Sequence, residues 1–447
     1  MATAVNAGAR LDRLPISRFH HRVFWLVGAG MFFDGYDLYV AGPVLAATIS
    51  TAFSSLAQNL QFISVTFVGM TIGAFITGFL GDRFGRRFTY QVNLLIFGLA
   101  SLAAAFAQNM EQLIACRFVQ GLGLGAEIVV GYSTLTEFVP PRSRGRWLAF
   151  MAFLVVSGLP VTTLLGNLII PNFGWRPMFV IAGVGALIVW YLRKSLPESP
   201  RWLEANGRTE EAQAILQSIE QEAAAAGPLP LPASPVPVPT FNLSSLLEGD
   251  LLRRMLVGSW VLITVNTLIF GFVTWIPQFF VTQGVSVARS LAYTLVIVIG
   301  SPIGCAIGAL SADALGRRPT IIGASMASII FGSLYPFAPA PVLLLIVGFL
   351  LIVAIYVQVA VLFGVYTPEL FPTEVRLRAN GICNTFGRAA TIVSPFIVIA
   401  LFQTYGIVGV LALMALLLVI QIIAVWGWGV EPRAKPLEVL ELPSAAK

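Results

Sequence analysis

A short basic segment between two apolar stretches determines the expected architecture: Gly78-Phe-Leu-Gly-Asp82-Arg83-Phe-Gly85-Arg86-Arg87. Its second copy reads Ala309-Leu-Ser-Ala-Asp313-Ala-Leu-Gly316-Arg317-Arg318, so Asp82, Gly85 and Arg86 return after 231 positions as Asp313, Gly316 and Arg317. Long apolar runs flank both copies. A charged loop that recurs between apolar runs indicates an internally duplicated membrane protein.

A second pair of loops repeats at almost the same distance. The segment Glu137-Phe-Val-Pro140-Pro-Arg-Ser-Arg144-Gly-Arg146 returns 232 positions later as Glu369-Leu-Phe-Pro372-Thr-Glu-Val-Arg376-Leu-Arg378. Two independent motifs at one offset predict two similar halves. Proteins built in this way place their substrate between the halves, near the middle of the membrane.

The composition supports this prediction. Of the 447 residues, 57% are hydrophobic and only 11% are charged, against about 25% charged in a soluble domain. A helix needs about 20 apolar residues to cross a bilayer core of about 30 Å, and open strand edges have no partner in lipid. We therefore expect an all-α membrane protein with twelve transmembrane helices in two six-helix, pseudo-symmetric bundles. The predicted spans are 23–46, 61–80, 88–109, 112–137, 147–170, 177–196, 255–282, 291–312, 319–338, 341–366, 379–403 and 406–428.

The basic residues fix the expected orientation. All lysines and arginines except Arg117, Arg176, Arg289 and Arg388 fall in segments that are cytoplasmic when both termini are inside. The net charge of +6 therefore reflects this sorting, and we expect no nucleic-acid partner. The expected domains are a cytoplasmic tail (1–22), the first bundle (23–196), a cytoplasmic linker with a proline-rich stretch (197–250), the second bundle (251–428) and a cytoplasmic tail (429–447). Within the linker, a helix is expected over 204–226.

Other classes of function lack their usual residues. The first apolar run is long enough to span the membrane, which argues against a cleavable signal peptide. The only histidines, His20 and His21, are neighbours, and there is no metal-spaced Cys or His cluster and no phosphate-binding P-loop. We therefore expect no enzymatic activity, no metal and no cofactor.

At this point the chain resembles the major facilitator superfamily, in particular its sugar-porter and metabolite:proton branch. The loop at 78–87 carries the superfamily signature. Branch markers are Arg117-Phe-Val-Gln-Gly121-Leu-Gly123-Leu-Gly125, Pro197-Glu-Ser-Pro-Arg-Trp-Leu203 and Pro368-Glu369-Leu-Phe-Pro372. Within the branch the chain is similar to bacterial inner-membrane metabolite transporters and to niacin and organic-acid porters. The second loop copy departs from the signature at Ala309 and Ala314, and Glu431-Pro-Arg-Ala-Lys lacks the usual Pro-Glu-Thr start and the following glycine.

The loop charges are expected to act as gates. Acidic and basic side chains at cytoplasmic helix ends can form charge-assisted hydrogen bonds that hold this side closed in one state and release it in another. The alternative is that these charges only fix topology and packing. The candidate gating residues are Asp82, Arg83, Gly85, Arg86, Arg87, Glu137, Arg144, Arg146, Asp313, Gly316, Arg317, Arg318, Glu369, Arg376 and Arg378.

Five ionisable residues lie inside predicted spans, and each costs at least about 2.5–3.5 kcal/mol to insert. Asp37 lies about 13 Å and Arg117 about 8 Å inside the outer ends of two antiparallel spans, which puts them at similar depth. The resemblance implies contact, because Gly35-Tyr36-Asp37 matches the Gly-Tyr-Asp of proton-coupled sugar porters, whose Asp pairs with the Arg that Arg117 matches. An Asp that alternately loses and regains an arginine could carry protons. The alternative is a permanent ion pair.

Asp34 and Glu127 are further candidates for proton coupling. Asp34 shares a helix face with Asp37, and the element Asp34-Gly-Tyr-Asp37 resembles the Asp-Gly-x-Asp of aromatic-acid:proton symporters. It is expected to carry a second proton, to contact substrate, or to accept an interhelical hydrogen bond. Glu127 is expected either to relay protons or to brace its helix against the span 379–403.

Arg388, near the middle of the span 379–403, would attract an anionic substrate, because guanidinium matches carboxylate geometry. Organic-anion carriers of similar sequence place an arginine there; the alternative is an internal pair with Asp34 or Glu127. Polar and aromatic side chains of this kind also orient small ligands or glue helices together. The other candidates for substrate binding are Asn266, Trp275, Gln278, Tyr356, Gln358 and Asn384.

The leading interpretation is a monomeric secondary transporter of the bacterial inner membrane, in which protons drive symport of a small polar metabolite, an organic acid or a sugar. Its expected partners are this substrate, protons and the lipid bilayer. The alternatives are a uniporter or exporter of the same fold, and a membrane sensor that does not transport. Intact loop motifs and buried charges argue against the sensor, which does not need them.

Overall fold

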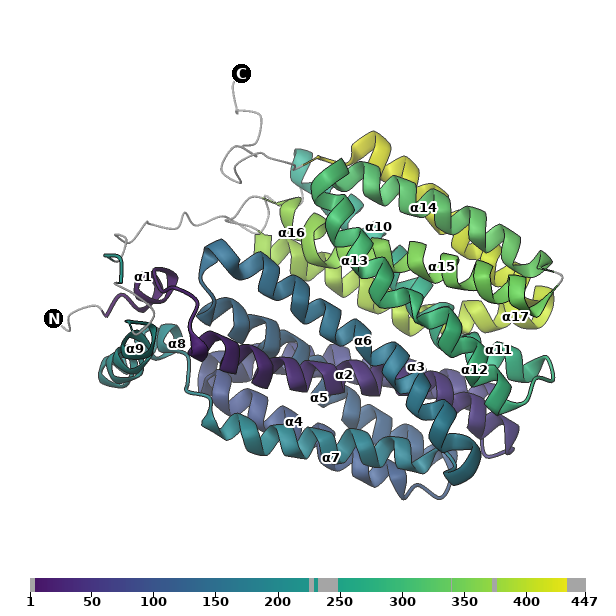
Figure 1. Cartoon of the computed structure of the whole chain (residues 1–447), viewed down its shortest axis with the longest axis horizontal. Helices are drawn as coiled ribbons and strands as arrows, with labels where there is room; N and C mark the ends of the chain where they lie inside the picture. Colours follow the sequence, from purple (N-terminus) through teal and green to yellow (C-terminus); the bar gives the residue numbers. More distant parts are fainter. Residues whose placement is uncertain (1–4, 225–228, 232–247, 339, 372–375, 432–447) are drawn as a thin grey trace. The chain divides into compact units, whose positions relative to one another are not determined.

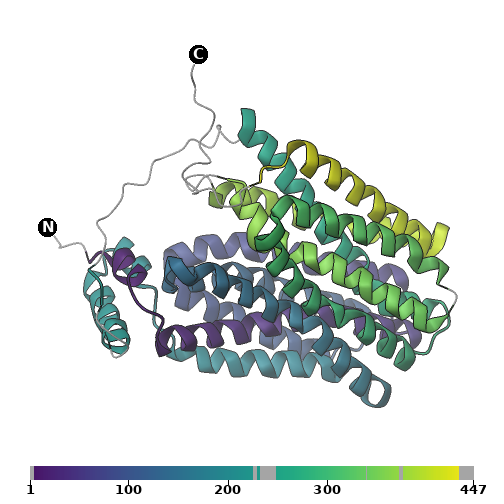
Figure 2. The same cartoon turned by 45° about the horizontal axis from the view of Figure 1, so that its top comes forward.

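The computed structural model describes residues 5–224, 229–231, 248–338, 340–371 and 376–431, and within them it contains helices and no strands. The helices of the first sequence repeat are α2 (Arg18–Ser50), α3 (Leu56–Phe84), α4 (Arg86–Ala105), α5 (Met110–Phe138), α6 (Pro141–Phe173) and α7 (Arg176–Leu192). Those of the second are α10 (Gly249–Gly271), α11 (Ile276–Thr282), α12 (Val287–Val298), α13 (Gly300–Leu315), α14 (Arg317–Leu334), α15 (Pro341–Val361), α16 (Thr367–Glu369) and α17 (Arg376–Trp428). Figures 1 and 2 follow these helices along the chain.

The helices agree with the twelve predicted spans. In the part of the chain that the structure describes, ten helical stretches are long and apolar enough to cross a membrane. The last of them, Ala379–Trp428, is divided by Gly406, whose φ of 64° is open to glycine but strained for other residues. With that division, and with α2, whose interior carries Asp34 and Asp37, the spans number twelve.

Two spans of the second repeat are interrupted. Between α10 and α11, Phe272 leaves the helical region (φ −123°, ψ −60°), and the turn η3 (Val273–Trp275) follows. Pro277 then occupies the first turn of α11, where its missing N–H leaves no hydrogen bond unmade. Between α12 and α13 only Ile299 intervenes. Broken helices at membrane depth free backbone groups, and transporters use such breaks to line binding sites.

The chain forms two compact units. The first contains Met1–Leu38, Val65–Gly158 and Arg176–Pro237, and the second contains Tyr39–Ser64, Leu159–Trp175 and Val238–Lys447. The predicted extracellular ends of α2, α3 and α6 therefore pack in one unit with the helices of the second repeat. The division into the bundles 23–196 and 251–428 remains a prediction from the sequence repeat.

The segments predicted to be cytoplasmic contain more structure than the sequence indicated. The tail predicted over 1–22 contains α1 (Ala7–Asp12) and the first turn of α2. The helix predicted over 204–226 is wrong at its start: α8 (Pro200–Ala205) ends near Gly207, whose φ is 75°, and α9 (Thr209–Ala224) begins after it. Charged and polar residues continue through this segment, so the sequence pattern did not indicate that Gly207 separates two helices. Figure 1 shows α1, α8 and α9 together beside the start of α2.

Candidate functional site

The structure brings Asp37 and Arg117 together inside the first unit. Both side chains are buried, and Arg117 Nη1 lies 2.5 Å from Asp37 Oδ2. The guanidinium also donates to the hydroxyl of Thr66 on α3 at 3.2 Å and to the amide oxygen of Gln120 on α5 at 3.2 Å. A buried ion pair needs such additional hydrogen bonds to offset the loss of water around two charges. The predicted contact is confirmed, while its role in proton coupling remains a prediction.

Glycines allow the helices around this pair to approach closely. A Cβ on Gly121 of α5 would lie 3.2 Å from the Cα of Gly69 on α3. A Cβ on Gly125, one turn later, would lie 2.6 Å from the Cα of Met70. Small residues at such spacing let membrane helices pack backbone against backbone. The glycine run of α5 therefore positions Arg117 against α3.

A second charged cluster lies deeper toward the predicted cytoplasmic side. Glu127 pairs with Arg193 of the short turn η1 (Arg193–Ser195), and each of these side chains is 1% exposed. Arg193 Nε and Nη2 also donate to the carbonyls of Leu26 and Val27 on α2, at 2.8 and 2.7 Å. The alternatives for Glu127 included a brace against the span 379–403; the partner observed for its carboxylate is Arg193.

Asp34 lies beside this cluster and is 2% exposed. Neither of its carboxylate oxygens has a hydrogen-bond partner among the described residues. Glu127 Oε2 likewise has none in this part of the chain. Arg193 was absent from the predicted site because it ends an apolar span and was read as a cytoplasmic charge. The excess of acids over arginines inside the spans was the signal that could have found it.

The substrate-binding candidates of the second unit fall into separate groups. Trp275 and Gln278 lie at the break between α10 and α11, where each is 1% exposed. Trp275 donates to the carbonyl of Phe270 at 3.1 Å, and Gln278 accepts from Asn59 of α3 at 3.2 Å. Tyr356 of α15 lies 3.4 Å from the hydroxyl of Tyr39 on α2. Figure 1 shows the course of the helices that carry these residues.

The other candidates make different contacts. Gln358 accepts from Gln421 of α17 at 2.7 Å and donates to Ser328 of α14 at 3.1 Å, within a buried network that links three helices. Asn266 and Asn384 each donate to a carbonyl one turn earlier in their own helices, at 2.7 and 2.9 Å. Arg388 is half-buried on α17. The contacts of Gln358 are therefore those of a residue that packs helices together, and they do not connect it to the other substrate-binding candidates.

Three hydrogen bonds inside the second unit join helices of both repeats. They are the bond of Asn59 to Gln278, the contact of Tyr39 with Tyr356, and a bond from Ser64 of α3 to the carbonyl of Ile392 on α17 at 3.0 Å. The first of these connects the predicted extracellular ends of α3 and α11. This connection was not predicted from the sequence, because Asn59 precedes the predicted span 61–80.

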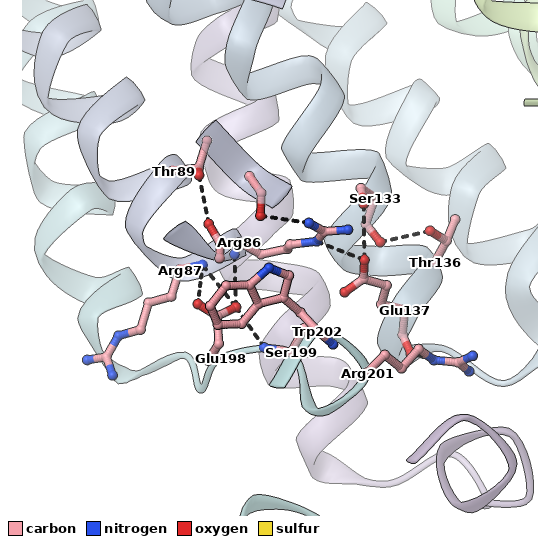
Figure 3. Close-up of polar contacts among 12 residues, drawn as sticks. Arg86, Arg87, Thr89, Ser133, Thr136, Glu137, Glu198, Ser199, Arg201 and Trp202 are labelled. Atoms are coloured by element: carbon pink, nitrogen blue, oxygen red, sulfur yellow. Dashed lines mark hydrogen bonds and ion pairs between the residues drawn. The ribbon is translucent and has the colours of Figure 1, made fainter. Parts of the chain in front are cut away.

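The first loop motif forms a charged latch at the start of α4 (Figure 3). Gly85 has a φ of 93°, and the carboxylate of Glu198 accepts the backbone N–H groups of Arg86 and Arg87 at 2.9 and 3.1 Å. A carboxylate at a helix start satisfies free N–H groups and favours the positive end of the helix dipole. The side chain of Arg86 binds Glu137 of α5 at 3.0 Å. This is a charge-assisted contact between helix ends of the kind predicted from the sequence. Burial raises the pKa of the Glu198 carboxyl.

The second copy repeats this geometry with different residues. Gly316 has a φ of 104°, and Glu431 accepts the backbone N–H groups of Arg317 and Arg318 at 3.0 and 2.8 Å. The side chain of Arg317 binds Glu369 at 3.0 Å. Glu431 therefore occupies the position of Glu198, despite the altered motif around it. Glu198 lies in a branch marker and Glu431 in the stretch that departs from the family pattern, and the role of both as helix caps was missed from the sequence.

The remaining gating candidates are less connected. Arg83 is exposed and lies over the ring of Phe84, with 5.4 Å between its guanidinium carbon and the ring centroid. Arg146 is exposed as well. The side chains of four candidates lie outside the described part of the chain; they are Asp82, Asp313, Arg376 and Arg378.

The segment that contains α1 is bound to the latch and the linker. Asp12 lies 2.6 Å from Arg201 of α8 and 3.3 Å from Arg144 of α6. Arg10 binds Glu220 of α9 at 2.6 Å. The hydrogen bond from Arg10 lowers the pKa of the Glu220 carboxyl. These pairs join α1 to α6, α8 and α9.

His20 makes the stability of this region depend on pH. The imidazole is buried against Phe19 and Phe138, and burial lowers its pKa to about 4. The unfolded chain takes up the proton first, so stability is full above about pH 6.5 and falls as the pH drops toward 4. We expect up to about 3 kcal/mol to be lost over this range.

Thermal unfolding of the purified protein between about pH 7 and pH 5 measures this loss. His20→Gln should reduce the acid-induced fall in unfolding temperature. His21→Gln, at the exposed neighbour, should reduce it much less, because burial lowers the pKa of His20 more than the charge of His21 does. An equal fall in the wild type and in His20→Gln would contradict the assignment.

Comparisons with known proteins agree with this fold. The sequence model of the Major Facilitator Superfamily matches residues 27–394. The inner membrane metabolite transport protein YdjE of Escherichia coli is 37% identical over 443 residues, which cover 96% of this chain and 97% of that protein. The niacin transporter NiaP of Acinetobacter baylyi is 31% identical over a stretch that covers 97% of this chain and 99% of that protein. A structure of the E. coli xylose transporter XylE superposes with a TM-score of 0.72 at 19% identity, covering 94% of this chain and all of that one.

Duplicated sets of membrane-spanning helices with ion pairs buried inside them define a polytopic transport protein. The chain belongs to the Major Facilitator Superfamily. It is a multi-pass metabolite transporter of the bacterial inner membrane.

Proposed function

We propose that this transporter couples the inward movement of a small polar metabolite to protons by alternating access. The observation that carries the proposal is the Asp37–Arg117 pair, because neither side chain is exposed to solvent and the carboxylate has only this one cation within 4 Å among the described residues. Breaking a buried pair of this kind leaves an uncompensated charge. Neutralising Asp37 with a proton removes that charge, so movement of the helices and protonation are linked.

The proposed cycle uses contacts at both predicted membrane faces. The bond from Asn59 to Gln278 would close the extracellular end in this conformation, with the contact of Tyr39 and Tyr356 deeper along α2 and α15, and both would break in the opposite conformation. At the cytoplasmic side, the pairs Arg86–Glu137 and Arg317–Glu369 would act as the gates. Salt bridges between rigid helices are suited to this role, because they have two discrete states.

A carboxylate-bearing substrate is proposed in preference to a neutral sugar. Arg388 supplies a cation on α17, and guanidinium binds carboxylate through two parallel hydrogen bonds. NiaP, which covers nearly the same length, transports niacin, a small aromatic carboxylic acid. The side chains proposed to orient the substrate are Asn266, Trp275, Gln278, Tyr356 and Asn384, with Gln358 in support.

Uptake into proteoliposomes tests the proposal. Radiolabelled pools of small organic acids and of sugars are offered under an imposed inward proton gradient, and a matched sample receives a protonophore. We expect an acid pool to accumulate above its outside concentration only when the gradient is intact. Equal uptake with and without the gradient would indicate a uniporter, and uptake of sugars alone would overturn the proposed substrate class.

A further inference from the structure

The guanidinium of Arg193 makes several contacts with buried groups. Its guanidinium binds Glu127 and the carbonyls of Leu26 and Val27, and its carbon lies 5.7 Å from the ring centroid of Tyr90. A Cβ at Gly30 would collide with Arg193 Nη2, so this glycine makes room for the guanidinium. Arg193 therefore lies against α2 with the carboxylate of Glu127 bound to it.

Asp34 adds a second carboxylate to the same place. It lies one helical turn after Gly30 on α2 and therefore on the same face. Its charge interacts with those of Glu127, Arg193 and Asp37. Both of its oxygens are buried and without a hydrogen-bond donor among the described residues, as is Glu127 Oε2.

Among the described residues, the buried charges of the first unit do not balance when all of them are ionised. The three acids Asp34, Asp37 and Glu127 face the two arginines Arg117 and Arg193, drawn from α2, α5 and η1. Arg117 is bound to Asp37 and Arg193 to Glu127, which leaves Asp34 with no cation within 4 Å among the described residues. An unpaired, unsolvated carboxylate inside a protein is too costly to persist, and such a group becomes neutral instead.

We propose that Asp34 and Glu127, of which Glu127 is paired with Arg193, form a proton-binding site separate from the Asp37–Arg117 pair, and that this site holds one proton in the present conformation. A metal cation fits less well. Hard cations take about six or more oxygen ligands, whereas the nearby carbonyls of Leu26 and Val27 already accept from Arg193. A cation would also lie against the guanidinium.

The site is also joined to the cytoplasmic latch. Arg193 precedes Glu198 by five positions, and the hydroxyl of Tyr90 donates to the carbonyls of Arg193 and Leu196, each at 3.4 Å. Release of Arg193 from Glu127 would therefore move the segment that presents Glu198 to α4. As a carrier of the transported proton, the site rests on the proposed symport; as a place where a proton is bound, it does not.

Infrared difference spectroscopy detects the C=O stretch of a protonated carboxylic acid in the reconstituted protein and needs no transport. We expect the wild type to show this band at neutral pH, shifted in heavy water and lost at high pH. Asp34→Asn and Glu127→Gln should each abolish it, because either change balances the charges. Arg193→Gln should increase it about twofold, because two carboxylates then lack a cation. Glu111→Gln, at an exposed carboxylate of α5, should not change it.

A wild-type spectrum without the band at neutral pH would overturn the proposal, and this measurement requires no variant to fold. A band that persists unchanged in both Asp34→Asn and Glu127→Gln would overturn it as well. If the band behaves as expected but uptake by the wild type is the same with and without the proton gradient, then the proposed symport is wrong and the proposed proton-binding site is retained.

Discussion

Asp37→Asn abolishes accumulation of substrate against its gradient but preserves exchange of substrate between the two sides of a proteoliposome. The asparagine keeps the shape of the side chain and one oxygen for Arg117, while it removes the group that takes up and releases the proton. Arg117 retains the hydroxyl of Thr66 and the amide oxygen of Gln120 as acceptors. Loss of the buried pair lowers stability by at most about 3–5 kcal/mol.

Counterflow and proton-driven uptake are measured on the same preparation, so that a misfolded variant is recognised by the loss of both. Glu111→Gln is the matched control, because it removes an exposed carboxylate from the same unit. It should retain both activities. Full accumulation by Asp37→Asn would show that this carboxylate is dispensable for coupling.

Gly125→Ala prevents assembly of the first unit. The added methyl group would lie 2.6 Å from the Cα of Met70 and would collide with the carbonyl oxygen of that residue. Because the obstacle is backbone, no side-chain rotation relieves it, and α3 must move away from α5. Overpacking usually costs about 1–3 kcal/mol, and we expect a loss at or above the upper end of this range.

Gly323→Ala provides the comparison, because a Cβ at Gly323 of α14 has no heavy atom within 4 Å and alanine favours the helix. Both variants are expressed and analysed by size-exclusion chromatography with fluorescence detection. We expect a monodisperse peak for Gly323→Ala and aggregated or absent protein for Gly125→Ala. Equal monodisperse yields would show that α3 and α5 do not approach as closely as the structure has them.

The fold could be predicted from the sequence because its signals are periodic and repeated. Apolar runs of membrane length and two charged motifs at one offset leave few alternatives in a bilayer. Position along two antiparallel spans also places Asp37 and Arg117 at similar depth. That the two helices touch was implied by the resemblance to proton-coupled sugar porters and not by position alone.

Arg193 and Glu198 were missed for a different reason. Arg193 lies at the end of the last predicted span of the first repeat and Glu198 follows it, where basic and acidic residues ordinarily meet water. Their side chains turn back into the protein because η1 and the following loop fold against α2 and α4. Asn59 was missed similarly, because only the packing of α3 against α11 turns a polar residue at a helix start into a partner of Gln278. Rotation of helices and the path of loops depend on packing that one sequence does not specify.

The most direct test of proton coupling is the internal pH of proteoliposomes that carry a trapped pH-sensitive dye. A substrate pool that is transported is added outside, with equal pH on both sides and with the membrane voltage clamped by potassium and valinomycin. The proposed symport predicts acidification of the interior that begins with substrate, saturates with its concentration and is absent in Asp37→Asn. Substrate entry at a normal rate with no change of internal pH would contradict it.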